Sequence, residues 1–318
     1  MQIGLINNLR AGRSDRLVSR MLGVLRDFPE VHHVETSQAG ALPEAVSELA
    51  HRGVELIIVN GGDGTLQRTL TEILNSDEFA QAPFVAPLRG GRTNTSAKDL
   101  GATRDPLRGM RAVAEAARAG RLHERFLHRP VLRVCFDRGR RVQYGMFFGV
   151  GVIHRAIKLV HDIFPQGRTQ GSLGAGLVTM GLILKSARHP NKGILLPDKV
   201  DLCIDGELLP GGEFRLAIAT TLRRLFWNMD PFWDQGDGDV RVTAITSDAK
   251  RLPLAAATGL WGRKPSFATP ENGYNSQNAH RVELRLSCGI TIDGEIYPSR
   301  PDELFTLTSD RRVTFVRA

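Results

Sequence analysis

A glycine-rich turn directly after an apolar run is the feature that most constrains the fold of this 318-residue chain. Residues 56–59, Leu-Ile-Ile-Val, predict a buried strand; Asn60 and then residues 61–65, Gly-Gly-Asp-Gly-Thr, follow it. Glycines leave backbone N–H groups uncovered, and a helix that begins there adds a dipole that favours an anion. We therefore predict a helix over residues 66–75 with a phosphate site at its N-terminus.

Asp63 lies between the glycines of this turn. An ordinary strand-to-helix turn needs no carboxylate there, whereas a phosphoryl-transfer site uses one to hold Mg²⁺ or a reacting hydroxyl. Asp63 is therefore a candidate catalytic residue. A purely structural turn is the alternative.

The composition predicts a globular protein without disulfides. Apolar residues make up 42% of the chain and charged residues 24%, and the three cysteines are scattered without metal-ligand spacing. The N-terminus predicts a first strand rather than a signal peptide, and the longest apolar stretch is too short to span a bilayer. We expect a cytoplasmic protein.

The net charge of +8 favours an anionic partner. Acidic lipid headgroups, nucleic acid and a polyphosphate ligand all fit this charge, as does a generally basic protein with no such partner. No helix-turn-helix, RNP-type or zinc-finger pattern is present, so we predict no nucleic-acid partner.

The N-terminal part of the chain alternates short apolar strands with amphipathic helices. This rhythm predicts an α/β domain with a doubly wound parallel sheet, whose ligands bind at the carboxyl ends of the strands. The expected strands are residues 2–7, 31–35, 55–60 and 84–87, and the expected helices are 14–27, 43–52, 66–75, 93–99 and 106–119.

After residue 122 the pattern changes to strands separated by Gly, Asp and Asn turns, which predicts a mainly antiparallel β-sandwich as the second domain. Residues 152–164 predict a helix whose apolar stripe packs on the sandwich or faces lipid. Residues 167–181 predict a mobile loop or gate, and residues 272–279 a polar, exposed segment. The expected strands are residues 130–137, 143–149, 199–204, 214–220, 240–246 and 282–286.

Residues 5–12 read Leu-Ile-Asn-Asn-Leu-Arg-Ala-Gly, and Thr36 follows the second predicted strand. With the turn at residues 61–65, these segments resemble the diacylglycerol kinase catalytic-domain family, the soluble bacterial lipid kinases related to sphingosine and ceramide kinases. In that family an Asn-Pro pair leads to a glycine that lines the nucleotide. Asn8 and Gly12 match this pattern, and Leu9 replaces the proline.

A fourth motif, residues 87–94, reads Pro-Leu-Arg-Gly-Gly-Arg-Thr-Asn and resembles the family's Pro-Leu-Gly-Thr-x-Asn loop with two extra residues. Arg92 stands at the threonine position, where a cation either clamps phosphate or obstructs it. Gln67 and Arg68 stand where many members have Asn and Glu, so side-chain contacts from that helix are not carried over.

A fifth motif, Asp293-Gly294-Glu295, matches a family Asp-Gly-Glu whose glutamate is thought to act as general base. The resemblance thus implies Glu295 as the base, with Asp293 beside it, although a simple turn is the alternative. The similar residues 205–207, also Asp-Gly-Glu, are predicted to form a hairpin turn.

The resemblance covers nearly the whole chain and implies a nucleotide-binding α/β domain of residues 1–122 plus 299–318. A β-sandwich lipid-substrate domain would comprise residues 123–298, with a cleft between the two domains and closing strands at 304–307 and 313–316. ATP and Mg²⁺ are the implied cofactors, and the metal ligands are not identified. The implied nucleotide-binding residues are Asn8, Gly12, Thr36, Gly61, Gly62, Gly64, Thr65, Arg92, Thr93 and Asn94.

The implied substrate is a membrane lipid with a primary hydroxyl, of the diacylglycerol or the ceramide and sphingoid type. Residues 223–233 contain two arginines and four aromatic residues, which suits docking to anionic lipid headgroups. Core packing around a turn explains such a segment equally well. We expect peripheral association with the inner membrane surface, and the oligomeric state, a homodimer included, stays open.

Two other functions fit parts of the pattern. NAD kinase shares the Gly-Gly-Asp-Gly loop, but the acidic Asn-Glu motif that those enzymes use for the nicotinamide nucleotide is not found in the middle of this chain. A non-catalytic lipid- or nucleotide-binding pseudokinase is favoured by the departures at Leu9, Gln67, Arg68 and Arg92.

Overall fold

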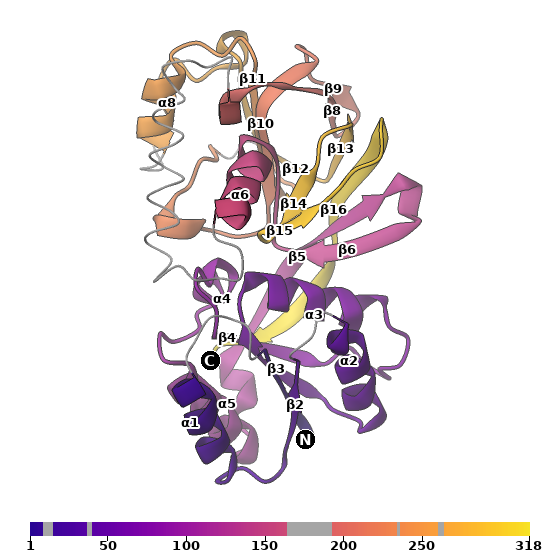
Figure 1. Cartoon of the computed structure of the whole chain (residues 1–318), viewed down its shortest axis with the longest axis vertical. Coiled ribbons are helices and arrows are strands. Elements are labelled where there is room, and N and C mark those ends of the chain that lie inside the picture. The colour runs from indigo at the N-terminus through magenta and orange to yellow at the C-terminus, as the bar shows by residue number, and fades with distance from the viewer. Residues whose placement is uncertain (9–14, 37–39, 164–192, 234–235, 260–263) are drawn as a thin grey trace. The chain divides into compact units, whose positions relative to one another are not determined.

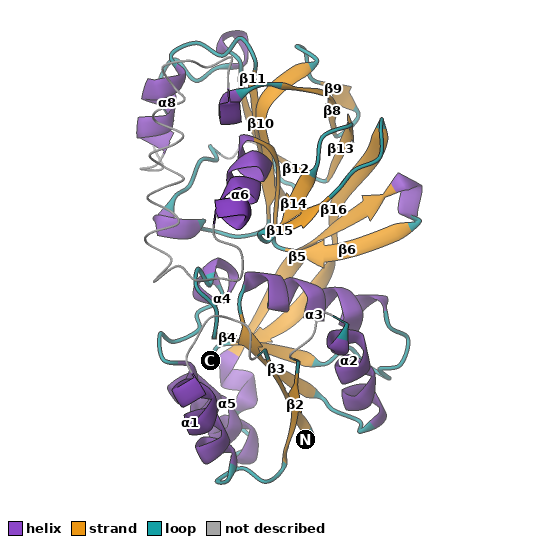
Figure 2. Ribbon diagram, viewed as in Figure 1, coloured by secondary structure: helices purple, strands orange, loops and turns teal. Residues whose placement is uncertain are grey.

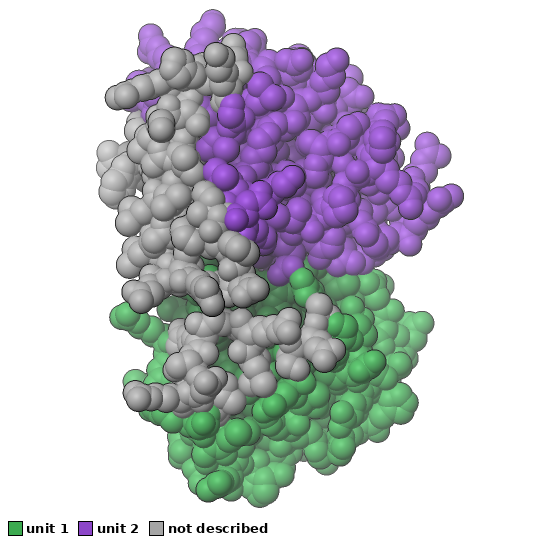
Figure 3. All heavy atoms as spheres, viewed as in Figure 1, with its two compact units in different colours: residues 1–131, 311–318 green, residues 132–310 purple. Residues whose placement is uncertain are grey.

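A computed structural model describes residues 1–8, 15–36, 40–163, 193–233, 236–259 and 264–318. The chain forms two compact units (Figure 3): unit 1 comprises residues 1–131 and 311–318, and unit 2 comprises residues 132–310. The domain boundaries predicted from the sequence differ from these, because they fall after residue 122 and before residue 299. The strands β5 (Phe126–Phe136) and β16 (Glu303–Val316) each contribute residues to both units, which explains the difference. Gly12 and the predicted loop 167–181 lie outside the described residues.

Unit 1 is built on a parallel sheet with the strand order β2-β1-β3-β4, and the end of β16 adds a further parallel strand beside β4. Helices α1 and α5 cover one face, and α2 and α3 cover the other (Figure 1). The predicted doubly wound sheet is confirmed. Its elements are β1 (Ile3–Asn7), α1 (Asp15–Leu25), β2 (Val31–Glu35), α2 (Ala41–His51), β3 (Leu56–Gly61), α3 (Asp63–Asn75), β4 (Phe84–Arg89), α4 (Thr95–Asp99) and α5 (Pro106–Arg118).

Strands β1 and β3 of unit 1 have mostly continuous rather than alternating apolar sequences because helices cover both faces of the sheet. Every residue of β1 and of β3 is buried. Helix α5 begins where the sequence places its signals: Pro106 occupies the first turn, and the Asp105 carboxylate accepts the Leu107 N–H at 2.9 Å.

Helix α3 begins at Asp63, three residues earlier than predicted. Gly62 adopts an extended conformation as the N-cap, and the Leu66 N–H donates to the Gly62 carbonyl at 3.1 Å. Residues 63–65 therefore form the first helical turn rather than a loop. Their N–H groups have no partner within the helix, because the first turn of any helix has none.

Unit 2 is a mainly antiparallel β-structure in which two layers of strands enclose one apolar core, as predicted (Figure 2). One layer contributes Phe136, Val200 and Leu284 to this core, and the other contributes Phe148 and Val242. The remaining strands are β6 (Arg141–Gly145), β7 (Phe147–Gly151), β8 (Asp198–Ile204), β9 (Glu207–Leu208), β10 (Glu213–Thr220), β11 (Val240–Thr246), β12 (Tyr274–Ala279), β13 (Arg281–Leu286), β14 (Ile290–Ile292) and β15 (Glu295–Tyr297).

The prediction of an exposed polar segment at residues 272–279 is wrong. Strand β12 pairs with β11 there, and Tyr274 and Ala279 are buried. The polar side chains find partners inside the sheet: the Ser276 hydroxyl bonds the Thr243 hydroxyl at 2.8 Å, and the Tyr274 hydroxyl donates to the Lys250 carbonyl at 2.7 Å. These hydrogen bonds let this polar sequence form a strand, which pairs with β11 on one side.

Two further strand predictions need correction. Residues 143–149 do not form one strand, because β6 ends at Gly145 and β7 begins at Phe147, with Met146 between them. Residues 304–307 and 313–316 are not two strands that both close the first domain. They are parts of the single strand β16, whose first half pairs with β13 in unit 2 and whose end pairs with β4 in unit 1.

Helix α6 (Val152–Ile163) packs on the strands of unit 2. Packing on the sandwich was one of the two predicted alternatives for this helix, and facing lipid was the other. Its Val152 and Ala156 side chains are buried. In the described part of the chain, no helix has the length and apolar character needed to cross a membrane.

A buried ion pair connects α4 to the start of β5 within unit 1. The Arg129 guanidinium donates to the Asp99 carboxylate at 2.8 Å, and the two side chains are only 6% and 4% exposed. We expect Arg129→Met to lower the free energy of unfolding by about 3 kcal/mol, because a carboxylate then loses its buried partner. Denaturant unfolding measures this loss. The double variant Arg129→Met, Asp99→Leu should recover most of it, and an equally unstable double variant would contradict a dominant role for the pair.

Candidate phosphate-binding site

The first turn of α3 lies at the carboxyl ends of β1 and β3, where the strand order of unit 1 reverses direction. Ligands of open α/β sheets bind at this switch point. Asn8, directly after β1, donates from its side-chain nitrogen to the Thr65 hydroxyl at 2.8 Å, and its backbone N–H donates to the Asn60 carbonyl at 2.9 Å. The structure therefore brings together Asn8 and Thr65, two of the predicted nucleotide-binding residues.

Two glycine pairs pack directly against each other beside this turn. A Cβ atom added to Gly91 would lie 2.3 Å from the Gly62 Cα, and one added to Gly90 would lie 2.7 Å from the Gly61 N atom. Only glycines permit this approach of the loop after β4 to the loop after β3. Gly90 and Gly91 were not predicted as site residues, although a Gly-Gly pair after each of two adjacent strands was a usable signal.

The Asp63 carboxylate binds the start of α4. Its two oxygens accept the Thr95 N–H at 3.0 Å and the Ser96 N–H at 2.9 Å. Burial raises the pKa of the Asp63 carboxyl, and hydrogen bonds from Ser96, Thr95 and Asn94 partly oppose this shift. Asp63 thus has a structural role that the sequence did not reveal, and its predicted catalytic role stays a prediction.

The loop that contains Arg92, Thr93 and Asn94 is held by its last residue. Asn94 adopts a left-handed conformation with a φ of 51°; its side-chain oxygen accepts the Gly91 N–H and its side-chain nitrogen donates to the Gly91 carbonyl, both at 2.8 Å. Arg92 is half-buried and Thr93 is exposed. Asn94 therefore shapes the loop through hydrogen bonds that use its carboxamide.

Two asparagines bridge the ends of β1 and β3. The Asn60 side-chain nitrogen donates to the Asn7 side-chain oxygen at 2.8 Å, and both residues are buried. The predicted site residue Thr36 is buried beside Asn7. Its backbone N–H donates to the Asn7 carbonyl at 3.0 Å. Asn7 and Asn60 were missed because strand-end asparagines have no distinctive spacing.

In unit 2, both Asp-Gly-Glu sequences form the same hairpin turn. Asp205 and Asp293 have φ angles of 49° and 47°, and the glycine after each also has a positive φ. The Asp293 carboxylate accepts the Met146 N–H at 2.8 Å and the Phe147 N–H at 3.0 Å. The prediction for residues 205–207 is confirmed, and the turn alternative holds for residues 293–295 as well.

The Asp205 carboxylate holds a neighbouring segment in the same way, through the backbone N–H groups of His280 and Arg281. The backbone geometry of the turns therefore does not separate Glu295 from Glu207, although Glu295 is half-buried and Glu207 is exposed. The assignment of Glu295 as the base stays a prediction that rests on the family resemblance.

The predicted membrane-docking segment, residues 223–233, belongs partly to the core of unit 2. The side chains of Leu225, Met229 and Phe232 are buried, and the Asp230 carboxylate accepts hydrogen bonds from Arg224 and Arg241. Core packing therefore explains much of this segment.

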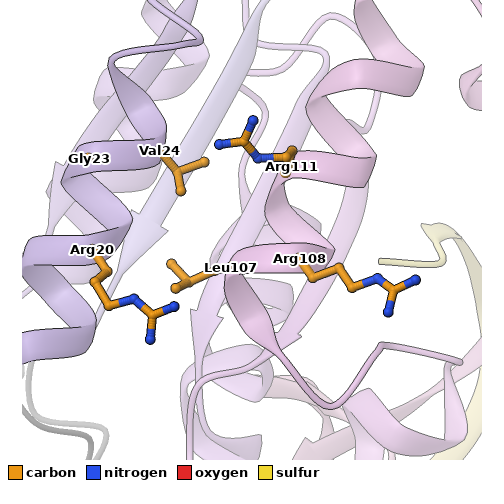
Figure 4. Close-up of a pocket in the computed structure, with 6 residues that line it drawn as sticks. All are labelled: Arg20, Gly23, Val24, Leu107, Arg108 and Arg111. Carbon is orange, nitrogen blue, oxygen red and sulfur yellow. The ribbon is translucent and has the colours of Figure 1, made fainter.

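A separate open groove of about 530 Å³ lies between α1 and α5 (Figure 4). It is lined by Arg20, Gly23, Val24, Leu107, Arg108 and Arg111. None of the predicted nucleotide-binding residues lines it. Within the described ranges, no three His, Cys, Asp or Glu side chains gather into a metal site.

Residues 2–123 match the family model of the diacylglycerol kinase catalytic domain. Over these residues the chain is similar to that catalytic domain. The resemblance predicted from the sequence is confirmed there, and the match supports a kinase that uses a nucleotide. No curated protein matches this chain.

Solved structures support the fold over the full length of the chain. A structure of diacylglycerol kinases from Bacillus anthracis strain Sterne superimposes with a TM-score of 0.62 at 17% identity, covering 100% of this chain and 97% of that chain. Two proteins of the same strain, provisionally named diacylglycerol kinases, superimpose with TM-scores of 0.69 at 18% and 17% identity and the same coverage. This likeness establishes the two-part fold.

Gly91→Ala should disrupt the contact between the two glycine loops. The new methyl group would overlap the Gly62 backbone, so we expect a loss of about 1–3 kcal/mol in the free energy of unfolding, together with weaker ATP binding. Gly23→Ala in α1 is the matched control, since an added Cβ there meets no atom within 4 Å. An equal effect of both substitutions would contradict the importance of the loop contact.

Asp63→Asn should change how stability depends on pH. Burial raises the pKa of Asp63 on folding, so the folded protein takes up this proton more readily than the unfolded chain. We expect the stability of the wild type relative to Asp63→Asn to increase as the pH falls from 7 towards 4. Thermal melting of both proteins across that range measures the difference, and a constant difference would contradict the raised pKa.

Proposed function

We propose that the protein is a lipid kinase that transfers the γ-phosphate of ATP, with Mg²⁺, to the primary hydroxyl of a membrane lipid of the diacylglycerol or the ceramide and sphingoid type. The observation that carries the proposal is the glycine-lined N-terminus of α3 in the segment that matches the diacylglycerol kinase catalytic domain. Backbone N–H groups at a helix N-terminus bind phosphate oxygens without a side-chain obstacle.

In this proposal unit 1 binds the nucleotide. The N–H groups of residues 62–65 bind phosphate oxygens, and Asn8 fixes the Thr65 side chain beside them. The proposed nucleotide-binding set also includes Gly12, Thr36, Gly61, Arg92, Thr93 and Asn94. Because the Gly90-Gly91 backbone presses on this turn, the N–H groups are held in place before the ligand arrives, which lowers the entropic cost of binding.

Mg²⁺ fits the residues at this turn. The ion is usually bound by one or two carboxylates together with phosphate oxygens and water. Asp63 would supply a carboxylate, whose oxygens also accept the Thr95 and Ser96 N–H groups. Bound Mg²⁺ would neutralise charge on the phosphates, while Asp63 and the α4 backbone keep the turn in shape.

In the proposed reaction, Glu295 of unit 2 accepts the proton of the lipid hydroxyl. The hydroxyl oxygen then forms a bond to the γ-phosphorus, the bond from that phosphorus to the bridging oxygen breaks, and ADP leaves. Asp293 is a positioning residue, since its carboxylate holds the turn before Glu295 against the backbone of Met146 and Phe147.

We also propose peripheral association with anionic membrane surfaces, which the net charge of +8 supports. On the docking segment, Arg223 is exposed, whereas Phe232 is buried under the Arg241 guanidinium at 4.8 Å from the ring centre. Charge, rather than deep insertion of this segment, would therefore dominate the attraction. A homodimer is compatible with this proposal.

The twin Asp-Gly-Glu turns provide a matched test of the catalytic proposal. Purified wild type, Glu295→Gln and Glu207→Gln are compared for transfer of label from γ-labelled ATP, with Mg²⁺, to micellar diacylglycerol, ceramide, a sphingoid base and NAD. We expect transfer to a lipid, a loss of about 100-fold or more in kcat for Glu295→Gln, and an unchanged rate for Glu207→Gln.

The panel also separates the rival functions. Transfer to NAD alone would identify an NAD kinase, and nucleotide binding without transfer to any acceptor would favour a pseudokinase. Equal rates for the two glutamine variants would overturn the role of Glu295 while leaving kinase activity intact.

A further inference from the structure

Arg89 is the last residue of β4 and stands in register with Gly61 of the glycine turn. Adjacent strands of a sheet lie about 4.8 Å apart, so Arg89 begins one strand away from the start of the phosphate site. It belongs to the loop that has two more residues than the family pattern. Neither the sequence nor the family match assigns it a role.

The side chain of Arg89 leaves the sheet on the face that α3 covers. A Cβ atom added to Gly61 would meet the Thr65 side chain of α3 at 2.5 Å, and residues in register on neighbouring parallel strands point to the same face. The preceding residue, Leu88, packs in the core with Leu107 and Met110 of α5 on the opposite face, as strand alternation requires. Arg89 and the N-terminal turn of α3 therefore share one side of the sheet.

Within the described residues, the Nε atom of the Arg89 guanidinium lacks an acceptor. This Nε atom is buried without a hydrogen bond, and the Arg89 side chain forms no ion pair or other hydrogen bond with the residues whose positions are described. A buried donor without a partner costs about 1–3 kcal/mol, more when it carries a charge. Arg92, in contrast, has a contact of its own.

A second cation increases this cost. The pKa of Arg89 is lowered first by burial and then by the positive charge of Arg104, which lies in the connection between α4 and α5. The Arg89 guanidinium stays protonated at neutral pH despite this shift. Two positive charges in mutual repulsion, one of them partly buried, form a site that an anion would stabilise.

We propose that Arg89, supported by Arg104, binds a phosphate group of the ligand that the α3 turn holds, and so forms an anion subsite specific to this chain's longer loop. The planar guanidinium matches two phosphate oxygens at once, which suits a terminal phosphate better than a carboxylate or a sugar. The terminal phosphate of the nucleotide and the phosphomonoester of a phosphorylated lipid have this same chemistry. The choice between these ligands rests on the proposed function, whereas the subsite itself does not.

Calorimetric titration of the full-length protein tests the subsite without any turnover. The wild type and Arg89→Gln are titrated with Mg·ATP, Mg·ADP and pyrophosphate, and their binding to phosphatidylcholine vesicles with and without phosphatidic acid is measured. Arg108→Gln is the matched control, because Arg108 is an exposed arginine of α5 that points away from α1 (Figure 4).

We expect Arg89→Gln to weaken binding of ATP or of phosphatidic acid about 10-fold or more, Arg104→Gln to weaken the same ligand about 3-fold, and Arg108→Gln to change neither. A loss for ATP with little change for ADP identifies the terminal phosphate as the ligand. A loss confined to phosphatidic acid identifies the phosphorylated lipid. Equal binding of every ligand by wild type and Arg89→Gln would overturn the proposal.

Arg89→Lys guards against a folding defect, because it keeps the charge and most of the side-chain volume but loses the planar fork. We expect it to melt near the wild type and to bind with intermediate affinity. If no acceptor is phosphorylated but Arg89→Gln still weakens pyrophosphate binding, the kinase proposal fails and the subsite stands. If the wild type binds none of the anions, the subsite is refuted.

Discussion

The backbone contact between Gly62 and Gly91 determines how the rest of the candidate site is arranged. It sets two strand-to-helix connections against each other without side chains between them. Asn94 then fixes Gly91 through two hydrogen bonds, and Asp63 fixes the first residues of α4. The consequence is a helix N-terminus whose donors are ordered by backbone packing.

The charges around this turn follow from that packing. Asp63 satisfies the N-terminus of the short helix α4 at the cost of burying a carboxylate, whose pKa rises as a result. On the neighbouring strand, Arg89 carries the opposite charge without a partner in the described structure. Backbone N–H groups occupy the Asp63 carboxylate, and the Arg89 Nε atom has no acceptor among the described residues. An anion bound in this region of unit 1 would therefore be stabilised by the Arg89 charge.

Much of this fold was predictable from the sequence, because unit 1 has strong local signals. The buried apolar strands and the capped helix α5 set the positions of the elements, and the glycine turn identified the end of β3. The predictions failed where tertiary contacts override local pattern. The polar strand β12 pairs with β11, and partners on other segments, such as Thr243, bond its buried side chains.

The candidate site was predictable only in part, for a similar reason. Residues 61–65 have a motif, whereas the roles of Asn60, Gly90 and Arg89 come from the register of β3 with β4, which no short sequence pattern reveals. The two Asp-Gly-Glu turns illustrate the opposite limit. They share sequence and backbone conformation and differ in that Glu295 is half-buried and Glu207 is exposed, so a measurement of function must decide their roles.

The long strand β16 has a consequence for biosynthesis. Its final residues complete the sheet of unit 1 beside β4, after the chain has passed through the whole of unit 2. During synthesis, the edge of β4 therefore lacks its β16 partner until residues 311–318 leave the ribosome. The order of synthesis therefore completes unit 1 only after the whole of unit 2 has been made.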